Sequence, residues 1–549
     1  MSIENVERID GVAQYDLIVI GSGSGNTLIG PEWDDKKVAL IDGGIFGGTC
    51  LNVGCIPTKM YVYPATIAQK TREVKHLGID AHVDAVHWPE IRDRIFASRI
   101  DRISEGGRDW RAGLPNVDFY DQYARFVGSH TLELTDGTRL QGRQIVIAAG
   151  SRAVLPPVPG IDSSKVYTND HIMRMDELPA RMVVIGGGVI AAEFSHVFSA
   201  FGTEVTQLNR SSRLLRGVDA EVVERFEKAA SKQWNIVKEA SLAEIRENAD
   251  GSVTVVAKRA SENGEELLEI PADAVLVATG RRPNTDTLNA KNYFDVQDGG
   301  LLSVDKYQRV LYNGAPVPGV FALGDVSSRY QLKHVANHEA RVVQYNLSHP
   351  EDLRASDHRY VPGAIFSNPQ IAIVGMTEEQ ARKQLADASY FGTMLVVLGY
   401  ADGLVSGSVN STANTVRPAL QVIKTKPGQK LVSGAFLMCF KDHVAVFSDC
   451  AINLNPDAEQ LSEIALQSAE TARAFGIDPK VGMLSYSTLG SGKGPDVDMV
   501  EEATKLLKEK APDLPVVGSI QFDAAWSPTV AATKAKGNDV AGHVNVFVF

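Results

Sequence analysis

The chain has 549 residues, 44% of them hydrophobic, and a net charge of −12, so it is an acidic protein too long for a single hydrophobic core. The negative charge argues against nucleic acid or an anionic membrane as the main partner, and no apolar run is long enough to span a membrane. Four cysteines are too few for a secreted disulfide scaffold. The opening MSIENVERIDGVAQ lacks the features of a signal peptide, and the expected location is the cytoplasm.

A nucleotide-binding fingerprint comes first along the chain. The apolar run Tyr15–Ile20 predicts a buried parallel strand, and it leads directly into a glycine turn made by Gly21, Gly23 and Gly25. Glycines let the backbone approach a pyrophosphate, which would lie on the N-terminus of the helix expected next. Asn26 stands where the third glycine of the fingerprint usually stands. A second strand, 37–41, ends at Asp42, an acid placed to hold a ribose.

Two cysteines come soon after it, in the stretch GGTCLNVGCIPTK. Cys50 and Cys55 are five positions apart, which on an ideal helix places them roughly 140° from each other. A disulfide between them therefore needs a distorted turn, and Gly54 makes the distortion cheap. A zinc site or a pair of inert core cysteines are the alternatives, but no second cysteine or histidine pair lies nearby to complete four zinc ligands. The spacing favours redox chemistry.

After an expected helix over 60–109, short strands near Val117, Phe126 and Leu132, and the apolar run 144–150, a second fingerprint appears. The strand 182–185 precedes a G-x-G-x-x-A turn made by Gly186, Gly188 and Ala191. Two fingerprints on one chain predict two nucleotides. The following strand, 204–208, ends at an asparagine instead of the acid typical of NADH sites. Arg210 and Arg216 lie just beyond it and favour the 2′-phosphate of NADPH, although a solvated basic patch is the alternative.

These motifs resemble the flavoprotein disulfide reductases, and Asn26 in the third fingerprint position resembles the mycothione reductase branch of that family. The resemblance covers roughly residues 1–387. It implies FAD in the first site, NADPH in the second, and a redox-active Cys50–Cys55 disulfide in which Cys50 attacks the substrate and Cys55 contacts the flavin. It also implies that Lys59 pairs with Glu193 beside the flavin. The remaining implied cofactor-binding residues are Thr49, Gly150, Gly280, Asp325 and Ala336.

The family would continue with a dimerisation domain that supplies a His-Pro…Glu acid–base pair to the partner subunit. After Gly375 the only histidines are His443 and His543, and neither precedes a proline. The sequence His349-Pro350-Glu351 matches the motif by chance, because it lies before the expected interface domain and not within it. The resemblance therefore implies a homodimer in the family, but a truncated interface makes this doubtful for the present chain.

The last 160 residues resemble phosphate acetyltransferase instead, through motifs at 390–394, 401–407, 411–418, 452–460, 483–494 and 521–525. Four hydroxyl residues crowd a glycine-rich loop there, a plausible cradle for phosphate, namely Ser485, Ser487, Thr488 and Ser491. Arg417 could clamp a phosphate. Against activity, Asn410 and Asn414 stand where that family usually has His and Asp, and the first half of its catalytic domain is absent. A sheet without half its strands is expected to leave its own faces unburied.

The predicted fold class is α/β, with two Rossmann-like domains, a truncated interface domain and a partial acetyltransferase-like domain. The expected boundaries are 1–160 and 284–348 for FAD, 161–283 for NAD(P), 349–388 for the interface and 389–549 for the acetyltransferase-like fragment. The predicted function is NADPH-dependent reduction of mycothione or a similar small disulfide, with no metal. The alternatives are acetyl transfer between coenzyme A and phosphate, and an FAD-binding fusion without turnover.

Overall fold

The computed structural model describes residues 9–261 and 264–549. The first eight residues, part of the segment expected to lack a signal peptide, lie outside the described residues. The chain forms two compact units, Met1–Glu379 and Gln380–Phe549, which we describe separately as unit 1 and unit 2. Among the described helices, none combines the length and the apolar character that a bilayer crossing needs.

The first sheet of unit 1 is built around β1 (Ala13–Ile20), which pairs in parallel with β2 (Val38–Ile41) and β6 (Arg139–Ile147). The full order is β17-β18-β6-β1-β2-β3, with the β4–β5 hairpin attached to β6. All four residues of β2 are buried, as expected for a central parallel strand. The other strands are β3 (Val117–Tyr120), β4 (Ala124–Gly128), β5 (Thr131–Leu134), β17 (Arg309–Tyr312) and β18 (Ala315–Ala322).

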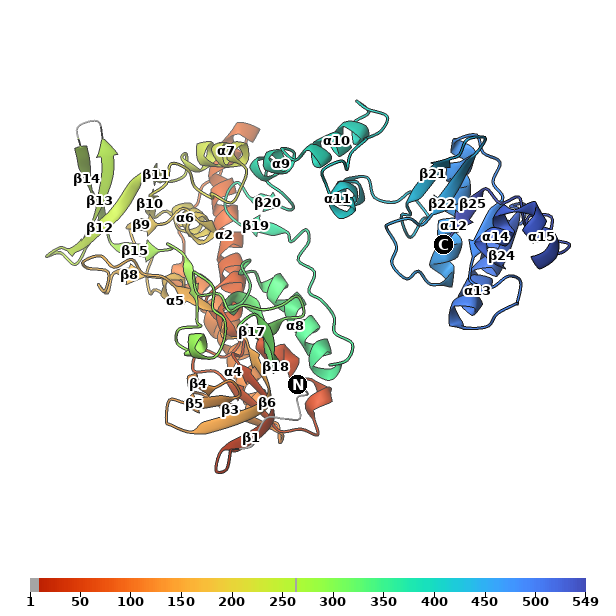
Figure 1. Ribbon diagram of the computed structural model, residues 1–549. Helices are drawn as coiled ribbons and strands as arrows, with labels where there is room; N and C mark the ends of the chain where they lie inside the picture. The colour runs from red at the N-terminus through yellow and green to blue at the C-terminus, as the bar shows by residue number, and fades with distance from the viewer. Residues whose placement is uncertain (1–8, 262–263) are drawn as a thin grey trace. The chain divides into compact units, whose positions relative to one another are not determined.

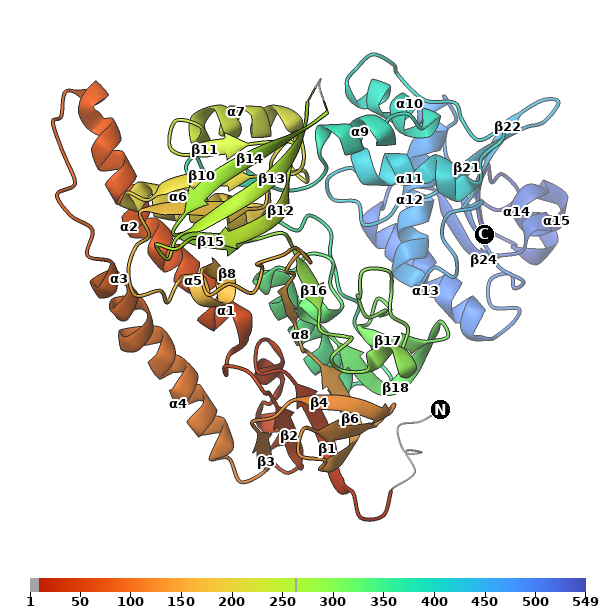
Figure 2. The ribbon, with the colours of Figure 1, turned by 90° about the vertical axis from the view of Figure 1, so that its left-hand side faces the viewer.

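The second sheet has the order β11-β10-β9-β15-β8. Its centre is β9 (Arg181–Ile185), which connects through the buried helix α6 (Val189–Phe201) to its parallel neighbour β10 (Glu204–Leu208). Strands β12–β14 form a separate antiparallel sheet (Figure 2). The remaining bounds are β8 (Val166–Tyr167), β11 (Asn235–Val237), β12 (Ala240–Glu247), β13 (Val253–Ser261), β14 (Gly264–Ala272) and β15 (Ala274–Val277). The two main sheets, each with parallel central strands and a fingerprint after one of them, confirm the predicted α/β class.

The helix expected over 60–109 is interrupted. Helix α2 (Cys55–Glu73) passes into a 3₁₀ turn that Gly78 ends in the left-handed region, at a φ of 79°. The chain is irregular until α3 (Trp88–Ile95), which starts with Pro89 in its first turn. A π-helical turn over Phe96–Ile100 then joins α3 to α4 (Asp101–Ala112). Figure 1 shows the long α2 beside α6.

The rest of unit 1 connects the two sheets. The two-stranded ladder of β7 (Ser151–Ala153) and β16 (Arg281–Pro283) lies where the chain leaves and re-enters the first sheet. Helix α8 (Lys333–Ser348) follows the first sheet, and the hairpin β19 (Gly363–Ile365) and β20 (Ile371–Ile373) comes after it. The remaining helices are α1 (Gly48–Asn52), α5 (Asn169–Ile172) and α7 (Ala220–Ala230).

Unit 2 contains a five-stranded sheet in the order β21-β22-β25-β23-β24, parallel except for the β21–β22 pair. Its strands are β21 (Ala435–Cys439), β22 (Val444–Ser448), β23 (Val481–Leu484), β24 (Val516–Ile520) and β25 (Val546–Val548). Its helices are α10 (Ala388–Val397), α11 (Thr412–Val422), α12 (Ala458–Ala474), α13 (Pro495–Lys510), α14 (Phe522–Trp526) and α15 (Pro528–Lys534). Helix α9 (Glu378–Gln384) spans the boundary between the units.

The expectation that this sheet leaves its faces unburied is wrong. Val546 and Val548 belong to a buried cluster with α12 and α13, whereas Phe547 between them belongs to a second buried cluster with α14 and α15. Because side chains alternate along a strand, the two clusters lie on opposite faces of the sheet. The expectation holds only at the edge strand β21, where Phe436 and Met438 are exposed.

Candidate functional site

The cysteine pair lies at a break between two helices. Helix α1 contains Cys50 and α2 starts at Cys55, with Val53 and Gly54 outside regular helical geometry between them. A side chain at position 54 would place its Cβ 2.9 Å from the carbonyl oxygen of Thr49, so the break requires glycine. This confirms the predicted distortion at Gly54. Both cysteines are partly buried thiols in the structure.

The two thiols differ in pKa. The hydrogen bond from Cys50 lowers the pKa of Cys55 to about 7, with further stabilisation of the thiolate from the Lys59 charge. The same hydrogen bond, together with burial, raises the pKa of Cys50. Cys55 is thus the thiol that ionises first near neutral pH, while Cys50 carries the shared proton. Lys333, at the start of α8, acts in the opposite direction on Cys50, because its positive charge favours the Cys50 thiolate.

The predicted Lys59–Glu193 pair is replaced by an arrangement around Phe366. The Glu193 carboxylate accepts a hydrogen bond from the Phe366 backbone N–H at 2.9 Å, and the Lys59 ammonium lies 4.2 Å from the centroid of the Phe366 ring. No direct ion pair within 4 Å joins the two charges, and both are among the described residues. Burial raises the pKa of Glu193, while the Phe366 N–H and Lys59 partly offset this. No motif in the sequence pointed to Phe366, which enters from the β19–β20 hairpin.

A chain of hydrogen bonds connects the cysteine break with Asp325. Asn169 Nδ2 donates to the Val53 carbonyl at 3.0 Å, and its Oδ1 accepts from Arg281 at 3.2 Å. Arg281 also donates to the Ser151 hydroxyl and carbonyl, at 2.9 and 2.6 Å. The Ser151 hydroxyl in turn donates to Asp325 at 2.7 Å. Motif spacing could not reveal this network, because the two residues of each hydrogen-bonded pair lie more than 100 positions apart in the sequence.

The first fingerprint adopts the predicted turn, but the helix expected after it is absent. Gly21 has a φ of 105°, and a side chain there would meet the Ala148 carbonyl oxygen at 2.3 Å. Beyond Gly25 the chain forms only two short 3₁₀ turns, at Gly25–Leu28 and Pro31–Trp33. Because Gly30 and Pro31 interrupt the segment and β2 begins at Val38, too few residues remain for a full helix. The first site therefore lacks the full helix whose N-terminal dipole was expected to hold a pyrophosphate.

The other residues predicted for FAD surround this loop. Asp42 accepts hydrogen bonds from the backbone N–H groups of Ser22 and Gly44, at 2.7 and 2.8 Å. A side chain at Gly48 would meet Gly23 Cα at 2.8 Å, so the redox helix, which includes Thr49, packs directly on the fingerprint. Gly150 comes after β6 at a φ of 67°. Ala336 lies in the first turn of α8, buried near Gly324 beside Asp325.

The second fingerprint has the predicted helix. Gly186 has a φ of 139°, with the Ala278 carbonyl oxygen 2.3 Å from any added Cβ. Gly188 caps α6, and Ala191 is fully buried within it. Gly280 comes after β15 at a φ of 137° and leaves space around its Cα. These features form the turn and close packing that a dinucleotide site requires.

The two predicted phosphate-binding arginines lie at the edge of this loop. Asn209 is buried, and its side-chain amide donates to the Ser211 and Arg213 carbonyls at 2.9 and 3.0 Å, which fixes the loop. Arg210 and Arg216 are exposed on that loop. Their guanidinium groups are thus accessible to a ligand phosphate.

In the glycine-rich loop of unit 2, the side-chain hydroxyl groups mostly accept hydrogen bonds from nearby backbone N–H groups. Ser487 accepts the Gly492 N–H at 2.8 Å, Ser491 accepts the Thr488 N–H at 2.9 Å, and Thr488 accepts the Gln521 N–H at 3.1 Å. Ser487 and Thr488 are buried. Arg417 is exposed on α11, and Asn410 and Asn414 are also exposed. In this arrangement the buried hydroxyls stabilise the loop.

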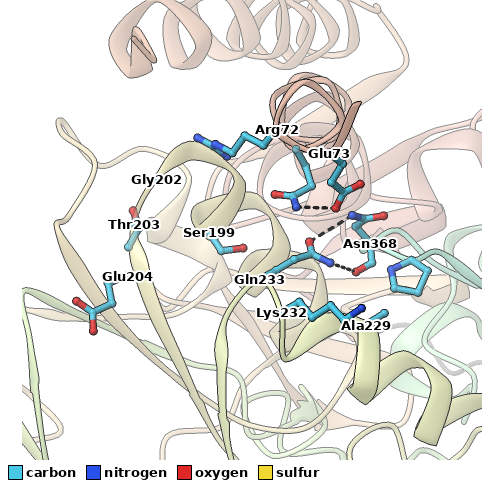
Figure 3. A pocket seen from close by; sticks show the side chains of 12 residues that line it. Arg72, Glu73, Ser199, Gly202, Thr203, Glu204, Ala229, Lys232, Gln233 and Asn368 are labelled. Carbon is cyan, nitrogen blue, oxygen red and sulfur yellow. Dashed lines mark hydrogen bonds between the residues drawn. The ribbon is translucent and has the colours of Figure 1, made fainter. Parts of the chain in front are cut away.

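A cavity of about 780 Å³ lies at the far end of α2, where Arg72, Glu73 and Lys232 contribute charges (Figure 3). Gln233 closes one side by donating to the Asn368 carbonyl at 2.9 Å. Arg72 lies 17 positions after Cys55 on α2, which corresponds to roughly 25 Å along the helix. The cavity is therefore separate from the cysteine pair. Across residues 9–261 and 264–549, no group of three or more His, Cys, Asp or Glu side chains is arranged to hold a metal.

Comparison with known proteins identifies both parts of the chain. Residues 15–340 match the family of pyridine nucleotide-disulphide oxidoreductases, and residues 363–549 match the phosphate acetyl/butaryl transferases. The phosphate acetyltransferase of Nitratidesulfovibrio vulgaris is 58% identical over 175 residues, 32% of this chain. Only 25% of that relative's length is covered. The C-terminal part is thus a phosphate acetyltransferase-like segment.

For the oxidoreductase part, mycothione reductase from Mycobacterium tuberculosis is 41% identical over 469 residues, covering 84% of this chain and 95% of the relative. This alignment is longer than the expected 387 residues and overlaps the C-terminal match, so the truncation of the interface domain stays a prediction. The HOCl-induced flavoprotein disulfide reductase RclA of Escherichia coli has a TM-score of 0.57 and 29% identity, over 67% of this chain and 79% of RclA. The chain belongs to the pyridine nucleotide-disulphide oxidoreductase family.

Proposed function

We propose that the chain is an FAD-dependent reductase that uses NADPH to reduce mycothione or a similar low-molecular-weight disulfide through Cys50 and Cys55. The observation that carries this proposal is the cysteine pair at a helix break, packed on the first fingerprint, with the pKa of Cys55 lowered to about 7 by the hydrogen bond from Cys50. An activated thiolate next to a second thiol is the arrangement that thiol–disulfide exchange needs.

The first fingerprint fits FAD. The backbone of Gly21 and Gly23 in the glycine turn is partly exposed, as a pyrophosphate site requires. Asp42 lies at the end of β2 for a ribose, and Asp325 lies beside the carboxyl end of β18. Gly150 offers open space where a side chain would otherwise project. When bound there, FAD would carry two electrons from the nicotinamide to the cysteine pair.

The chemistry of the cysteines depends on their protons. The Cys50 thiolate attacks one sulfur of the substrate disulfide, forms a mixed disulfide and releases the first product thiolate, which takes up a proton. The Cys55 thiolate then attacks Cys50, re-forms the Cys50–Cys55 disulfide and releases the second product. Because Cys50 holds the shared proton in the resting pair, it must lose this proton before attacking.

Two further features bear on the rate of each half-reaction. Exposed Arg210 and Arg216 beside the second fingerprint support a preference for NADPH. The family's His-Pro acid–base pair has no counterpart after Gly375, since His443 and His543 both precede valine. A general acid typically contributes about 10²–10⁴ in rate. We therefore propose that NADPH reduces the flavin and the cysteine pair while disulfide turnover is slow. We also propose that the family's dimer interface is truncated in this chain, and that the protein works in the reducing cytoplasm.

Rapid-mixing spectroscopy tests the proposal. The purified protein should be yellow and lose its flavin absorbance on mixing with NADPH. Steady-state reduction of mycothione should be slow, and Cys50→Ser should abolish it while leaving flavin reduction intact. A colourless protein, or one whose flavin NADPH fails to reduce, contradicts the proposal. Turnover at ordinary enzyme rates, roughly 1–10³ s⁻¹, would show that another residue replaces the missing histidine.

The identity of unit 2 to phosphate acetyltransferases favours a second activity, acetyl transfer between coenzyme A and phosphate. The self-bonded hydroxyls of Ser487 and Thr488 and the exposed Asn410 and Asn414 favour a segment without turnover. Formation of acetyl phosphate from acetyl-CoA and phosphate by the full chain decides between these two functions.

A further inference from the structure

Arg111 is the one buried arginine or lysine in the part of the chain that the structure describes, with 5% of its surface exposed. It lies in the last turn of α4 and points at the first fingerprint. Its Nε donates to the Asn26 side-chain oxygen at 2.6 Å, and its Nη2 donates to the Asn26 backbone carbonyl at 2.8 Å. Arg111 thus holds the residue that occupies the third glycine position of the fingerprint.

Both hydrogen-bond partners of Arg111 are neutral. Burial lowers the pKa of its guanidinium, and no nearby carboxylate offsets this. The other strongly buried charge in the same unit, Glu339, has a charged neighbour, because His358 lies 2.9 Å away and the Gly324 N–H donates to it at 2.7 Å. A buried charge without a counter-ion is costly unless a ligand supplies one.

The surroundings indicate where that counter-ion would lie. The fingerprint lacks the full helix whose N-terminal dipole would stabilise a pyrophosphate, and two short 3₁₀ turns replace it, the first over Gly25–Leu28. Arg111 brings a full positive charge to that turn from a helix outside the motif. Arginine also suits phosphate because its planar donors match the phosphate oxygens.

We propose that Arg111, held by Asn26, supplies the positive charge that neutralises the pyrophosphate of FAD, in place of the missing helix dipole. This inference rests on the proposed function, in which the first fingerprint binds FAD. It assigns Asn26 a role as the residue that positions Arg111. It also explains why the third fingerprint position has a side chain, since glycine could not accept the Nε hydrogen bond.

The test measures ligand affinity of the flavin-free full-length protein by calorimetry. Arg111→Met should bind FAD and ADP about 10–100-fold more weakly than wild type, because charged hydrogen bonds to phosphate are lost, and adenosine within about twofold. Arg111→Lys should recover part of the loss. The matched control is Arg108→Met on the same helix, where Arg108 pairs with Asp121 at 2.9 Å, and it should leave all three affinities unchanged.

A second variant, Asn26→Asp, tests the inference even if the Arg111→Met protein does not fold. The substitution is nearly isosteric and gives Arg111 an internal anion, so the flavin-free protein should melt at the same or a higher temperature. FAD should nevertheless bind at least tenfold more weakly, because the carboxylate takes the place of the phosphate. The inference is wrong if Asn26→Asp binds FAD with wild-type affinity, or if Arg111→Met loses affinity for ADP and adenosine equally. Either result leaves the proposed function standing. A wild-type protein that fails to bind FAD overturns the proposed function as well.

Discussion

In both fingerprints the first glycine lies against a backbone carbonyl of the neighbouring strand end, Ala148 for Gly21 and Ala278 for Gly186. After this shared turn the two sites differ. The second continues into the 13-residue helix α6, with Ala191 fully buried, whereas the first continues into two 3₁₀ turns interrupted by Gly30 and Pro31. The same glycine pattern therefore determines the turn but does not determine whether a helix comes after it. We therefore expect the two sites to stabilise their nucleotides differently, the second through the N-terminus of α6 and the first through the Arg111 charge.

The largest effects are expected at the glycines that the two sites share. Gly21→Ala should lower flavin content at least tenfold, because its Cβ would collide with the Ala148 carbonyl. Gly186→Ala should leave the protein yellow but slow flavin reduction by NADPH at least 100-fold. Absorbance spectra and rapid mixing measure both. Gly202→Ala is the matched control, since Gly202 has a φ of 106° and open space, so the added Cβ meets only the backbone strain, about 1–2 kcal/mol. Equal flavin loss in both fingerprint variants would remove the assignment of one nucleotide to each site.

The next effect concerns the charges of the second site. Replacing Arg210 and Arg216 together with alanine should raise the KM for NADPH about 10–100-fold, because hydrogen bonds to a charged group contribute roughly 1.5–3 kcal/mol each. The KM for NADH should change little. Steady-state flavin reduction with each cofactor measures the ratio. An equal rise for both cofactors would mean that the arginines do not read the 2′-phosphate.

A further difference is that the first loop packs on the redox helix. Because the pKa of Cys55 is lowered to about 7, its alkylation by iodoacetamide in the reduced protein should rise steeply through pH 7 and level off above about pH 8. At pH 7 about half of Cys55 is thiolate, against a few per cent for an ordinary cysteine near pKa 8.5. Peptide mass spectrometry measures the rates, with the exposed Cys439 as internal reference. In Cys50→Ala, which removes the hydrogen-bond donor, the Cys55 profile should move to higher pH.

The smallest effect is expected from restoring the usual glycine to the first fingerprint. Asn26→Gly recreates the common motif, yet it should weaken FAD binding about three- to tenfold, because Arg111 loses its side-chain acceptor. Titration of the flavin-free protein with FAD measures this. Tighter binding in Asn26→Gly would show that the asparagine is a defect of the fingerprint.

The sequence predicted the strands well because buried parallel strands are short apolar runs, as at β1, β9 and β10. It also predicted the break at Gly54, since two cysteines five positions apart cannot meet on a regular helix. The missing helix after Gly25 was readable in principle from Gly30 and Pro31, but the fingerprint outweighed that local signal. Arg111, Asn169 and Phe366 could not be found, because contacts over such long sequence separations depend on the completed fold.

The core of unit 2 was misjudged for a different reason. Helices α12 to α15 alternate with the sheet strands in the ordinary way, and this supplies cover for both faces. The absent half of the acetyltransferase family's domain suggested uncovered strands, yet the retained strands close around β25, whose Val546 and Phe547 face opposite sides. A count of missing strands therefore predicts burial poorly when the retained segments include their own crossover helices.

The two-sided core of unit 2 has a consequence for how the protein is degraded in a cell. The buried clusters on the two sides of β25 should keep this part folded even after unit 1 has unfolded, although the edge strand β21 exposes Phe436 and Met438. The exposed stretch around Val405 and Val409 is the contrasting part, and it is where a protease would cut first. Such a cut would leave a persistent acetyltransferase-like remnant, so antibodies against the C-terminus would overstate the amount of intact reductase.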